Sequence, residues 1–178
     1  MEAQQLTLQD LRLYSLQQEP QKVAVGMEGF IYRISENHVA KIPHDRNVDE
    51  WLRNDESAIE SIVNEYKIAR ELFDGGVCVP KPEGVFNIHM GLEPPVLLER
   101  GRDYPGFVME YIPGESLEGY MGRDYGLRVA MYDEELEKAE ELGFLTIDAE
   151  DCNGIWSPVK GKVYICDFGE WRRKEDVH

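Results

Sequence analysis

In the first half of the chain, three short apolar segments rich in β-branched and aromatic residues precede one long segment whose apolar residues recur at helical spacing. Three runs, at 22–25, 29–34 and 38–42, are rich in Val, Ile, Phe and Tyr and are separated by turn residues, so they predict strands. The period then becomes helical, from a predicted capping box at Ser57-Ala58-Ile59-Glu60 to a glycine exit at Gly75-Gly76. Strands joined through one crossing helix predict an α+β arrangement.

The remaining patterns extend this arrangement to the rest of the chain. They predict a short helix over 7–16, a strand pair at 85–90 and 96–100, a strand at 107–112, a helix at 133–142 and a last strand at 162–166. Strands therefore dominate the first part and a helix the second. We expect one domain over 1–178 with two lobes, about 1–110 and 111–178, and a ligand site in the cleft between them.

The chain is strongly acidic, with 35 Asp and Glu against 19 Lys and Arg and a formal net charge of −16. A field of this sign repels phosphates, so general coating of DNA or RNA is not expected. It could attract a basic protein partner, or it could simply be a solvated surface that keeps the protein monomeric. The sequence does not predict the oligomeric state.

Composition also predicts the compartment. No apolar run approaches the roughly 20 residues that span a bilayer, and the first residues lack the pattern of a signal peptide. Cys78, Cys152 and Cys166 form no CxxC pair and are odd in number. We therefore expect reduced, mostly buried thiols in a cytoplasmic protein without membrane contact.

Three polar residues near the end of the chain suit phosphoryl transfer. Asp148 precedes Asn153 by five positions, and Asp167 follows a predicted strand fourteen positions later. Asn153 and Asp167 offer the oxygen ligands that Mg²⁺ prefers, and Asp148 could orient an attacking hydroxyl as a base. Taken singly, each carboxylate could equally be a helix cap or a turn residue.

The spacing of these residues resembles the catalytic core of the protein-kinase-like superfamily. There the pattern is H-x-D-x-x-x-x-N, then a strand, then D-F-G. Here Thr146-Ile147-Asp148 leads to Asn153, and the last predicted strand leads to Asp167-Phe168-Gly169. The resemblance implies ATP and Mg²⁺ as cofactors, with Asn153 and Asp167 as metal ligands and Asp148 as a catalytic residue.

An earlier strand and helix supply two further matches. Val39-Ala40-Lys41-Ile42 resembles the V-A-I-K motif, whose lysine pairs with the α- and β-phosphates of ATP. A lone strand lysine is more often a solvated edge residue, but Lys41 follows an apolar pair in the same strand. The resemblance implies that Glu65, on the long helix, pairs with Lys41, because the rival Glu60 is assigned to the capping box.

Two backbone segments complete the resemblance. Met109-Glu110-Tyr111-Ile112-Pro113-Gly114 is similar to the hinge, where adenine would bond to the carbonyl of Glu110 and the amide of Ile112. Gly26 and Gly29 lie between two strands, where a phosphate-covering loop belongs, but G-x-G-x-x-G is incomplete. The loop and the passage that follows the helix look like those of RIO kinases, the KEOPS kinase subunit and aminoglycoside-phosphotransferase-like enzymes. The implied fold is kinase-like, with an antiparallel sheet and one main helix in the N-lobe and a reduced, mainly helical C-lobe.

The sequence departs from the kinase pattern at several points. Thr146 replaces the usual histidine, and Glu150 stands where many kinases carry lysine, so its charge would repel a phosphoryl group. The sequence stops nine residues after Gly169, which predicts a truncated C-lobe without activation segment or A-P-E motif. The basic run Arg172-Arg173-Lys174 could bind a partner, but we expect a solvated, frayed tail.

These features predict an atypical phosphotransferase that acts on Ser or Thr of a protein or on itself. Three alternatives stay open. The first is a pseudokinase that binds nucleotide as an interaction module, which Thr146 and Glu150 favour. The second is an ATPase or small-molecule kinase, and the third is an acidic interaction domain that binds no nucleotide.

Overall fold

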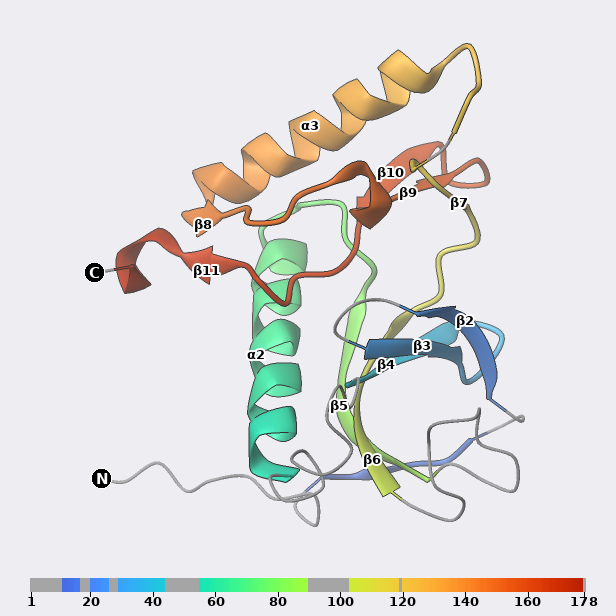
Figure 1. The fold of residues 1–178 in the computed structure, drawn as a ribbon, viewed down its shortest axis with the longest axis vertical. Coiled ribbons are helices and arrows are strands. Elements are labelled where there is room, and N and C mark those ends of the chain that lie inside the picture. The colour runs from blue at the N-terminus through green and yellow to red at the C-terminus, as the bar shows by residue number, and fades with distance from the viewer. Residues whose placement is uncertain are drawn as a thin grey trace. The chain divides into compact units, whose positions relative to one another are not determined.

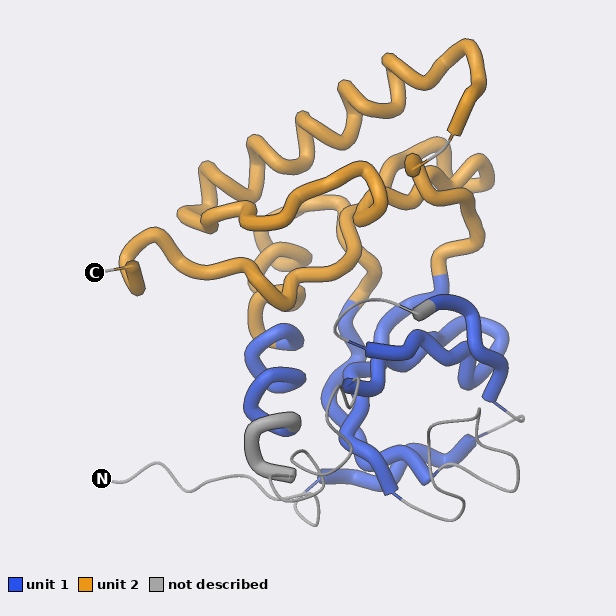
Figure 2. Tube along the Cα trace, viewed as in Figure 1, with its two compact units in different colours: residues 1–66, 82–111 blue, residues 67–81, 112–178 orange. Residues whose placement is uncertain are grey.

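A computed structural model describes residues 11–16, 20–25, 29–43, 55–89, 103–118 and 120–177. The described chain has an α+β fold with one six-stranded mixed sheet, two smaller sheets and two α-helices (Figure 1). It divides into unit 1, residues 1–66 and 82–111, and unit 2, residues 67–81 and 112–178 (Figure 2). No helix among the described residues is long and apolar enough to cross a membrane.

Unit 1 is built on the six-stranded sheet, in the order β1-β5-β6-β4-β3-β2. Its strands are β1 (Leu13–Tyr14), β2 (Gln21–Val25), β3 (Gly29–Arg33), β4 (His38–Pro43), β5 (Pro82–His89) and β6 (Asp103–Glu110). Neighbouring strands are antiparallel except β1 and β5, which are parallel. The expected strands over 22–25, 29–34 and 38–42 are therefore confirmed, but the sheet is mixed rather than wholly antiparallel.

The alternation of side chains along β3 and β4 separates a hydrophobic core from the face that carries Lys41. Phe30 lies opposite Ile42, and Tyr32 lies opposite Ala40, so these side chains share one face. They belong to the buried cluster Phe30, Tyr32, Ile34, Ala40, Ile42, Ile88 and Val108. Lys41 lies between Ala40 and Ile42 in β4, and because successive side chains of a strand alternate, it points to the other face of the sheet.

Helix α2 (Asp55–Asp74) confirms the long helix predicted from the sequence. Ile59, Ile62, Ala69 and Leu72 recur at helical spacing and are buried. The predicted capping box is wrong, because the helix begins at Asp55 and Ser57 is already its third residue. Glu60, also assigned to that box, is an exposed residue inside the helix.

The end of α2 is set by backbone hydrogen bonds that a glycine makes possible. The amide of Gly76 donates to the carbonyl of Phe73 (3.1 Å), and the amide of Val77 donates to the carbonyl of Leu72 (3.0 Å). These two bonds form a Schellman motif, which needs a left-handed residue after the helix. Gly76 has φ +85°, as the predicted glycine exit requires.

Unit 2 combines one α-helix with short strands. Its elements are β7 (Glu115–Ser116), α3 (Tyr125–Glu141), β8 (Phe144–Leu145), η2 (Asp151–Asn153), β9 (Gly154–Ser157), β10 (Lys162–Ile165), β11 (Arg172–Arg173) and η3 (Lys174–Asp176). Strands β10, β9 and β7 form one antiparallel sheet, and β11 pairs with β8 in another. The predicted strand at 162–166 is confirmed, whereas β7, β9 and β11 were not predicted.

Two helix predictions need correction. Helix α3 begins at Tyr125, eight residues before the predicted start at Asp133. Its first turns bury Arg128 and Tyr132, and a buried arginine breaks the apolar period on which the prediction relied. The helix over 7–16 is wrong for its described part, because Leu13–Tyr14 is strand β1 and pairs with β5.

The predicted strand pair at 85–90 and 96–100 also changes. Strand β5 pairs with β6 on one side, from Pro82 opposite Met109 to His89 opposite Asp103. Residues 96–100 lie outside the described residues. The apolar run at 107–112 is thus the second half of a strand that starts at Asp103 and ends at Glu110.

The basic run at 172–174 is folded rather than frayed. Arg173 donates to the Leu142 carbonyl at the end of α3, forms an ion pair with Glu71 and lies 4.3 Å from the Phe144 ring centroid. The Lys174 ammonium donates to the carbonyl of Glu140 (3.0 Å). Cations at a helix C-terminus satisfy its last carbonyls, so this run caps α3.

We expect opposite effects when alanine replaces two glycines at the helix ends. At either position an added Cβ would meet no atom within 4 Å, so only the backbone matters. Gly76→Ala forces a left-handed alanine and should lower the free energy of unfolding by about 1 kcal/mol. Gly126→Ala, inside α3, should raise it by about 0.5–1 kcal/mol. Urea unfolding measures both, and a shift of both variants in the same direction would contradict this account of the α2 exit.

Candidate functional site

Lys41 and Glu65 form a buried ion pair in unit 1. The Lys41 Nζ lies 2.8 Å from the Glu65 Oε1, and the two side chains are only 6% and 4% exposed. Lys41 comes from β4 and Glu65 from α2, so the pair joins the sheet to the helix across a separation of 24 residues. The predicted pairing of these two residues is therefore present.

Aromatic side chains pack beside this ion pair. Phe107 lies opposite Lys41 in the neighbouring strand β6, and its ring packs edge-on against Tyr66, the residue after Glu65. The two ring centroids are 5.9 Å apart. Such surroundings make desolvation of both charges expensive, and a hydrophobic pair of similar volume would often be as stable. The charge of Lys41 therefore suggests a role beyond stability.

The predicted hinge follows the end of β6. Met109 is buried in that strand, and the amide of the next residue but one, Tyr111, donates to the carbonyl of Asn37 (2.7 Å). Glu110 ends the strand, and Ile112 lies beyond it. The Ile112 amide makes no backbone hydrogen bond to another described residue, so it could donate to a ligand.

The two glycines assigned to a phosphate loop differ in what the structure describes. Gly26 lies outside the described residues. Gly29 is the first residue of β3, and an added Cβ would come within 2.6 Å of the Ile42 carbonyl oxygen. Close approach of β3 and β4 is thus sufficient to explain Gly29 without a ligand.

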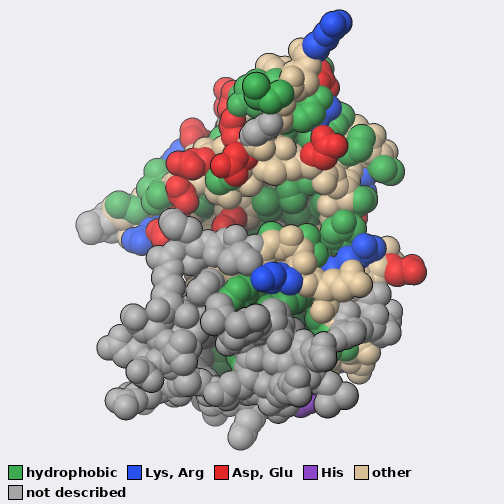
Figure 3. All heavy atoms as spheres, turned by 45° about the vertical axis from the view of Figure 1, so that its right-hand side comes forward, with side chains coloured by type: hydrophobic (Ala, Val, Ile, Leu, Met, Phe, Trp, Pro, Cys, Tyr) green, Lys and Arg blue, Asp and Glu red, His purple; other side chains and the backbone are tan. Residues whose placement is uncertain are grey.

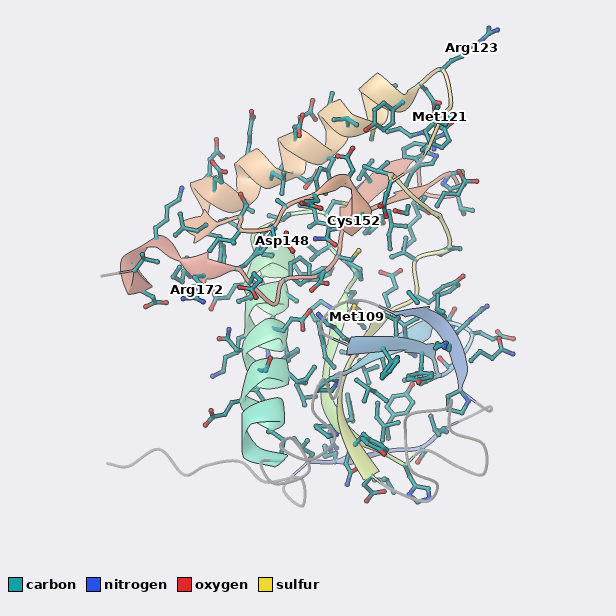
Figure 4. The ribbon with its side chains drawn as sticks, viewed as in Figure 1. Met109, Met121, Arg123, Asp148, Cys152 and Arg172 are labelled. Carbon is teal, nitrogen blue, oxygen red and sulfur yellow. The ribbon has the colours of Figure 1, made fainter. Side chains whose placement is uncertain are left out.

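Asp148 begins a tight loop in unit 2 that leads to Asn153. Its carbonyl accepts hydrogen bonds from the Glu150 amide (3.0 Å) and from the Asn153 side-chain amide (2.9 Å). Asp148 has φ 58°, an uncommon conformation for a residue other than glycine. Its side chain is exposed; Figure 4 labels this residue on the loop before β9.

Asp167 is brought towards the same loop through the backbone of β10. The amide of Cys166 donates to the carbonyl of Asn153 (2.8 Å), so the residue after Cys166 leaves the strand beside this loop. Asp167 also has a positive φ, 72°. Phe168 and Trp171, both buried, pack edge-on at 5.5 Å and anchor the chain behind it. The structure thus gathers Asp148, Asn153 and Asp167 at one end of β10.

The donor set suits a magnesium ion held jointly with a phosphate ligand. The Asn153 Nδ2 donates to the Asp148 carbonyl, and the Asn153 Oδ1 lies 3.6 Å from the Cys152 Sγ, a weak contact that a cation would replace. Asp167 is half-buried. Mg²⁺ is commonly bound through one or two protein oxygens plus substrate phosphates. Among the described residues no group of three His, Cys, Asp or Glu side chains could hold a metal by itself.

Two tyrosines that the sequence analysis missed hold this loop against α3. The hydroxyl of Tyr132 donates to the Glu150 carbonyl (3.1 Å), and the hydroxyl of Tyr125 donates to the Asp151 carboxylate. The two tyrosines are seven residues apart, so they lie on one side of the helix. The spacing of seven residues could have identified this pair from the sequence. It was missed because the predicted helix began at Asp133 and so contained neither tyrosine.

The residues that depart from the kinase pattern lie on the surface of unit 2. Thr146 donates from its hydroxyl to the Glu140 carboxylate (3.1 Å), and the Glu150 side chain is exposed. Cys152 is also exposed, contrary to the expectation of mostly buried thiols, while Cys78 and Cys166 are half-buried. Partial burial and then the Glu150 carboxylate raise the pKa of the Cys152 thiol.

We expect Lys41→Met to lower the free energy of unfolding by about 3 kcal/mol, because the buried Glu65 carboxylate loses the Lys41 ammonium. The double variant Lys41→Met/Glu65→Leu should recover most of that loss. Arg70→Ala is the control, because it breaks an exposed i,i+4 pair with Asp74 and should cost less than about 0.5 kcal/mol. Urea unfolding measures all three, and a double variant no more stable than Lys41→Met would refute the buried pair.

No model of a known protein family matches this chain, and no curated protein matches it.

Proposed function

We propose that the chain is an ATP- and Mg²⁺-dependent phosphotransferase of kinase-like fold, acting on Ser or Thr of a protein or on itself. The observation that carries the proposal is the buried Lys41–Glu65 ion pair. A surface strand lysine would be solvated, whereas this ammonium is fixed by a carboxylate from another element. That arrangement suits a lysine that presents its charge to phosphate oxygens.

Unit 2 supplies the groups that the reaction needs at the transferred phosphoryl group. Asn153 and Asp167 would hold Mg²⁺, and Asp148 would accept the proton of the acceptor hydroxyl and orient it. When bound, Mg²⁺ neutralises charge on the β- and γ-phosphates. Asp148 and Asp167 both have a positive φ, and residues held in such sparsely populated conformations cluster at functional sites.

The segment after β6 would bind the adenine. Glu110 offers a backbone carbonyl and Ile112 a backbone amide, and these two groups are two residues apart. Met109, buried in β6, would fix the strand end from which they extend. Backbone groups placed in this way recognise a base edge without a dedicated side chain.

A pseudokinase is the second candidate, and the position of Glu150 favours it. Its carboxylate is exposed two residues after Asp148, in the tight loop that leads to Asn153. An anion there opposes a phosphoryl group that carries negative charge in the transition state. A pseudokinase of this kind would bind nucleotide through Lys41 and Asp167 but would not transfer phosphate.

Transfer of label from γ-labelled ATP to the protein itself or to a protein mixture tests the proposal. We expect the wild-type protein to incorporate label when Mg²⁺ is present. Asp167→Ala and Asp148→Asn should each reduce the rate of incorporation about a hundredfold or more, because each lacks a group that acts at the transferred phosphoryl group. Asp133→Asn is the matched control, since this exposed aspartate of α3 should leave incorporation unchanged. Equal labelling of wild type and Asp167→Ala would refute the proposal, and ATP-dependent thermal stabilisation without labelling would select the pseudokinase.

Cys152 reports on the metal site without any turnover. Its thiol is exposed and adjoins Asn153, with the Sγ 3.6 Å from the Asn153 Oδ1. Since the pKa of this thiol is raised, alkylation at neutral pH should be slow and should accelerate as pH increases. We expect Glu150→Gln to accelerate it, because one neighbouring negative charge is removed, and Mg²⁺ with ATP to slow it.

The protection experiment has an internal control. Cys78→Ser/Cys166→Ser leaves Cys152 as the single thiol of the three in the sequence, and alkylation is followed by mass spectrometry. Asp167→Ala should abolish the protection by Mg²⁺ with ATP while leaving the rate without nucleotide unchanged. If Mg²⁺ with ATP slows alkylation equally in this variant, Asp167 is not a ligand of the metal.

A further inference from the structure

A shallow hollow lies at the start of α3 in unit 2. It has a volume of about 380 Å³ and is lined by Tyr120, Met121, Gly122 and Tyr125. Met121 is 95% exposed, although it is a large apolar side chain, and Tyr125 is 38% exposed. An apolar side chain beside a hollow with aromatic walls is a common feature of polypeptide-binding surfaces.

The wall of this hollow is held in place by Arg128. Its guanidinium is 3.7 Å from the Tyr120 ring centroid and 4.7 Å from that of Trp156, and the residue is only 8% exposed. The Asp124 carboxylate accepts from the Arg128 Nε (2.9 Å) and from the Tyr120 hydroxyl (2.6 Å). A wall fixed in this way loses little conformational entropy when a ligand binds.

Carboxylates border the hollow on the side of the Asp148 loop. The hydroxyl of Tyr125, in the wall, donates to Asp151, which belongs to that loop. Asp148 and Glu150 belong to this loop, and the Glu150 carboxylate lies 3.9 Å from the Cys152 Sγ in the same loop. Glu118 lies two residues before Tyr120 of the wall. No ion pair between described residues neutralises Glu118, Asp148 or Glu150.

The surface view agrees with this charge distribution. Acidic side chains lie beside hydrophobic ones near the top of the view, where α3 begins (Figure 3). Arg123, a cation at the same turn, extends outward from the fold, away from the labelled Asp148 and Cys152 (Figure 4). The border of the hollow that leads to Asp148 is therefore negative and available to a cation.

We propose that this hollow and its carboxylate border, defined by Met121, Tyr125, Glu118 and Glu150, form the docking site for the acceptor: a basic polypeptide segment that also carries an apolar side chain. The apolar side chain enters the hollow beside Met121, and Arg or Lys side chains of the same segment face the carboxylates. This inference rests on the proposed function, because Asp148 is taken as the group that receives the acceptor hydroxyl.

Other occupants fit the surface less well. The net charge of −16 and the local carboxylates disfavour nucleic acid. A second copy of the chain would have to supply a basic segment, but Arg173 and Lys174 of the basic run are engaged at the end of α3. The complementary charge is therefore expected on a different protein.

Fluorescence anisotropy with a synthetic peptide tests docking without any turnover. The probe carries arginines and a leucine around a central serine, and the control probe carries glutamates in place of the arginines. We expect Met121→Ser and Glu118→Gln each to weaken binding of the basic probe about five- to tenfold. Added salt should weaken it further, because exposed charges are screened. Val159→Ser is the matched control, since Val159 is 81% exposed on the same unit and should leave binding unchanged.

The outcomes separate this inference from the proposed function. Equal binding of both probes, or unchanged binding in Met121→Ser and Glu118→Gln, overturns the docking site even if the protein transfers phosphate. A dimer of the chain that Met121→Ser dissociates in sedimentation also overturns it, because the hollow is then a self-interface. Selective binding of the basic probe by a chain that transfers no more label from γ-labelled ATP than Asp167→Ala does supports the docking site and refutes the proposed function.

Discussion

The ion pair between Lys41 and Glu65 is the interaction on which the interpretation of this protein depends. It requires β4 to place one side chain on the face opposite its hydrophobic core, and it requires α2 to present a carboxylate to that side chain. Both charges are desolvated, so each stabilises the fold only while the other is present. An arrangement that contributes so little beyond a hydrophobic pair is easier to understand if the ammonium has a ligand.

The Asp148 loop of unit 2 is stabilised in a different way from the Lys41–Glu65 pair. Asp148 and Asp167 are held in left-handed conformations by backbone hydrogen bonds and by the packing of Phe168 and Trp171, rather than by burial of their own charges. The Asp148 side chain is exposed and that of Asp167 is half-buried, whereas both members of the Lys41–Glu65 pair are buried. The tyrosines of α3 fix the loop, and the hollow at the start of the same helix adjoins it. Unit 2 thus places the loop of the proposed chemistry and the hollow of the proposed recognition beside one helix, α3.

Much of this could be predicted from the sequence, for reasons that differ between residues. Lys41 and Glu65 were assigned through the resemblance to kinase motifs, while the strand and the helix that carry them were predicted from local patterns. Glu60 was set aside because of a capping box that α2 does not have, although Glu65 is the residue that pairs with Lys41. The strands over 21–25, 29–33 and 38–43 and the glycine exit of α2 are local in the same sense. The start of α3 was not predictable in this way, because Arg128 is buried on the helix although it is charged. Its guanidinium is accommodated by contacts with Tyr120, Trp156 and Asp124, and the hydrophobic periodicity of the helix contains no information about those contacts.

The sequence by itself determined the chemical types and their order: a strand lysine, a helix glutamate, and an aspartate, an asparagine and a second aspartate around a final strand. Only the tertiary structure decided that Lys41 and Glu65 meet, that β1 joins the sheet in parallel, and that the basic run at 172–174 caps α3. The physical reason is common to all three. Each depends on contacts between residues far apart in the chain, whose stability comes from desolvation and hydrogen bonding in the folded state rather than from local preference.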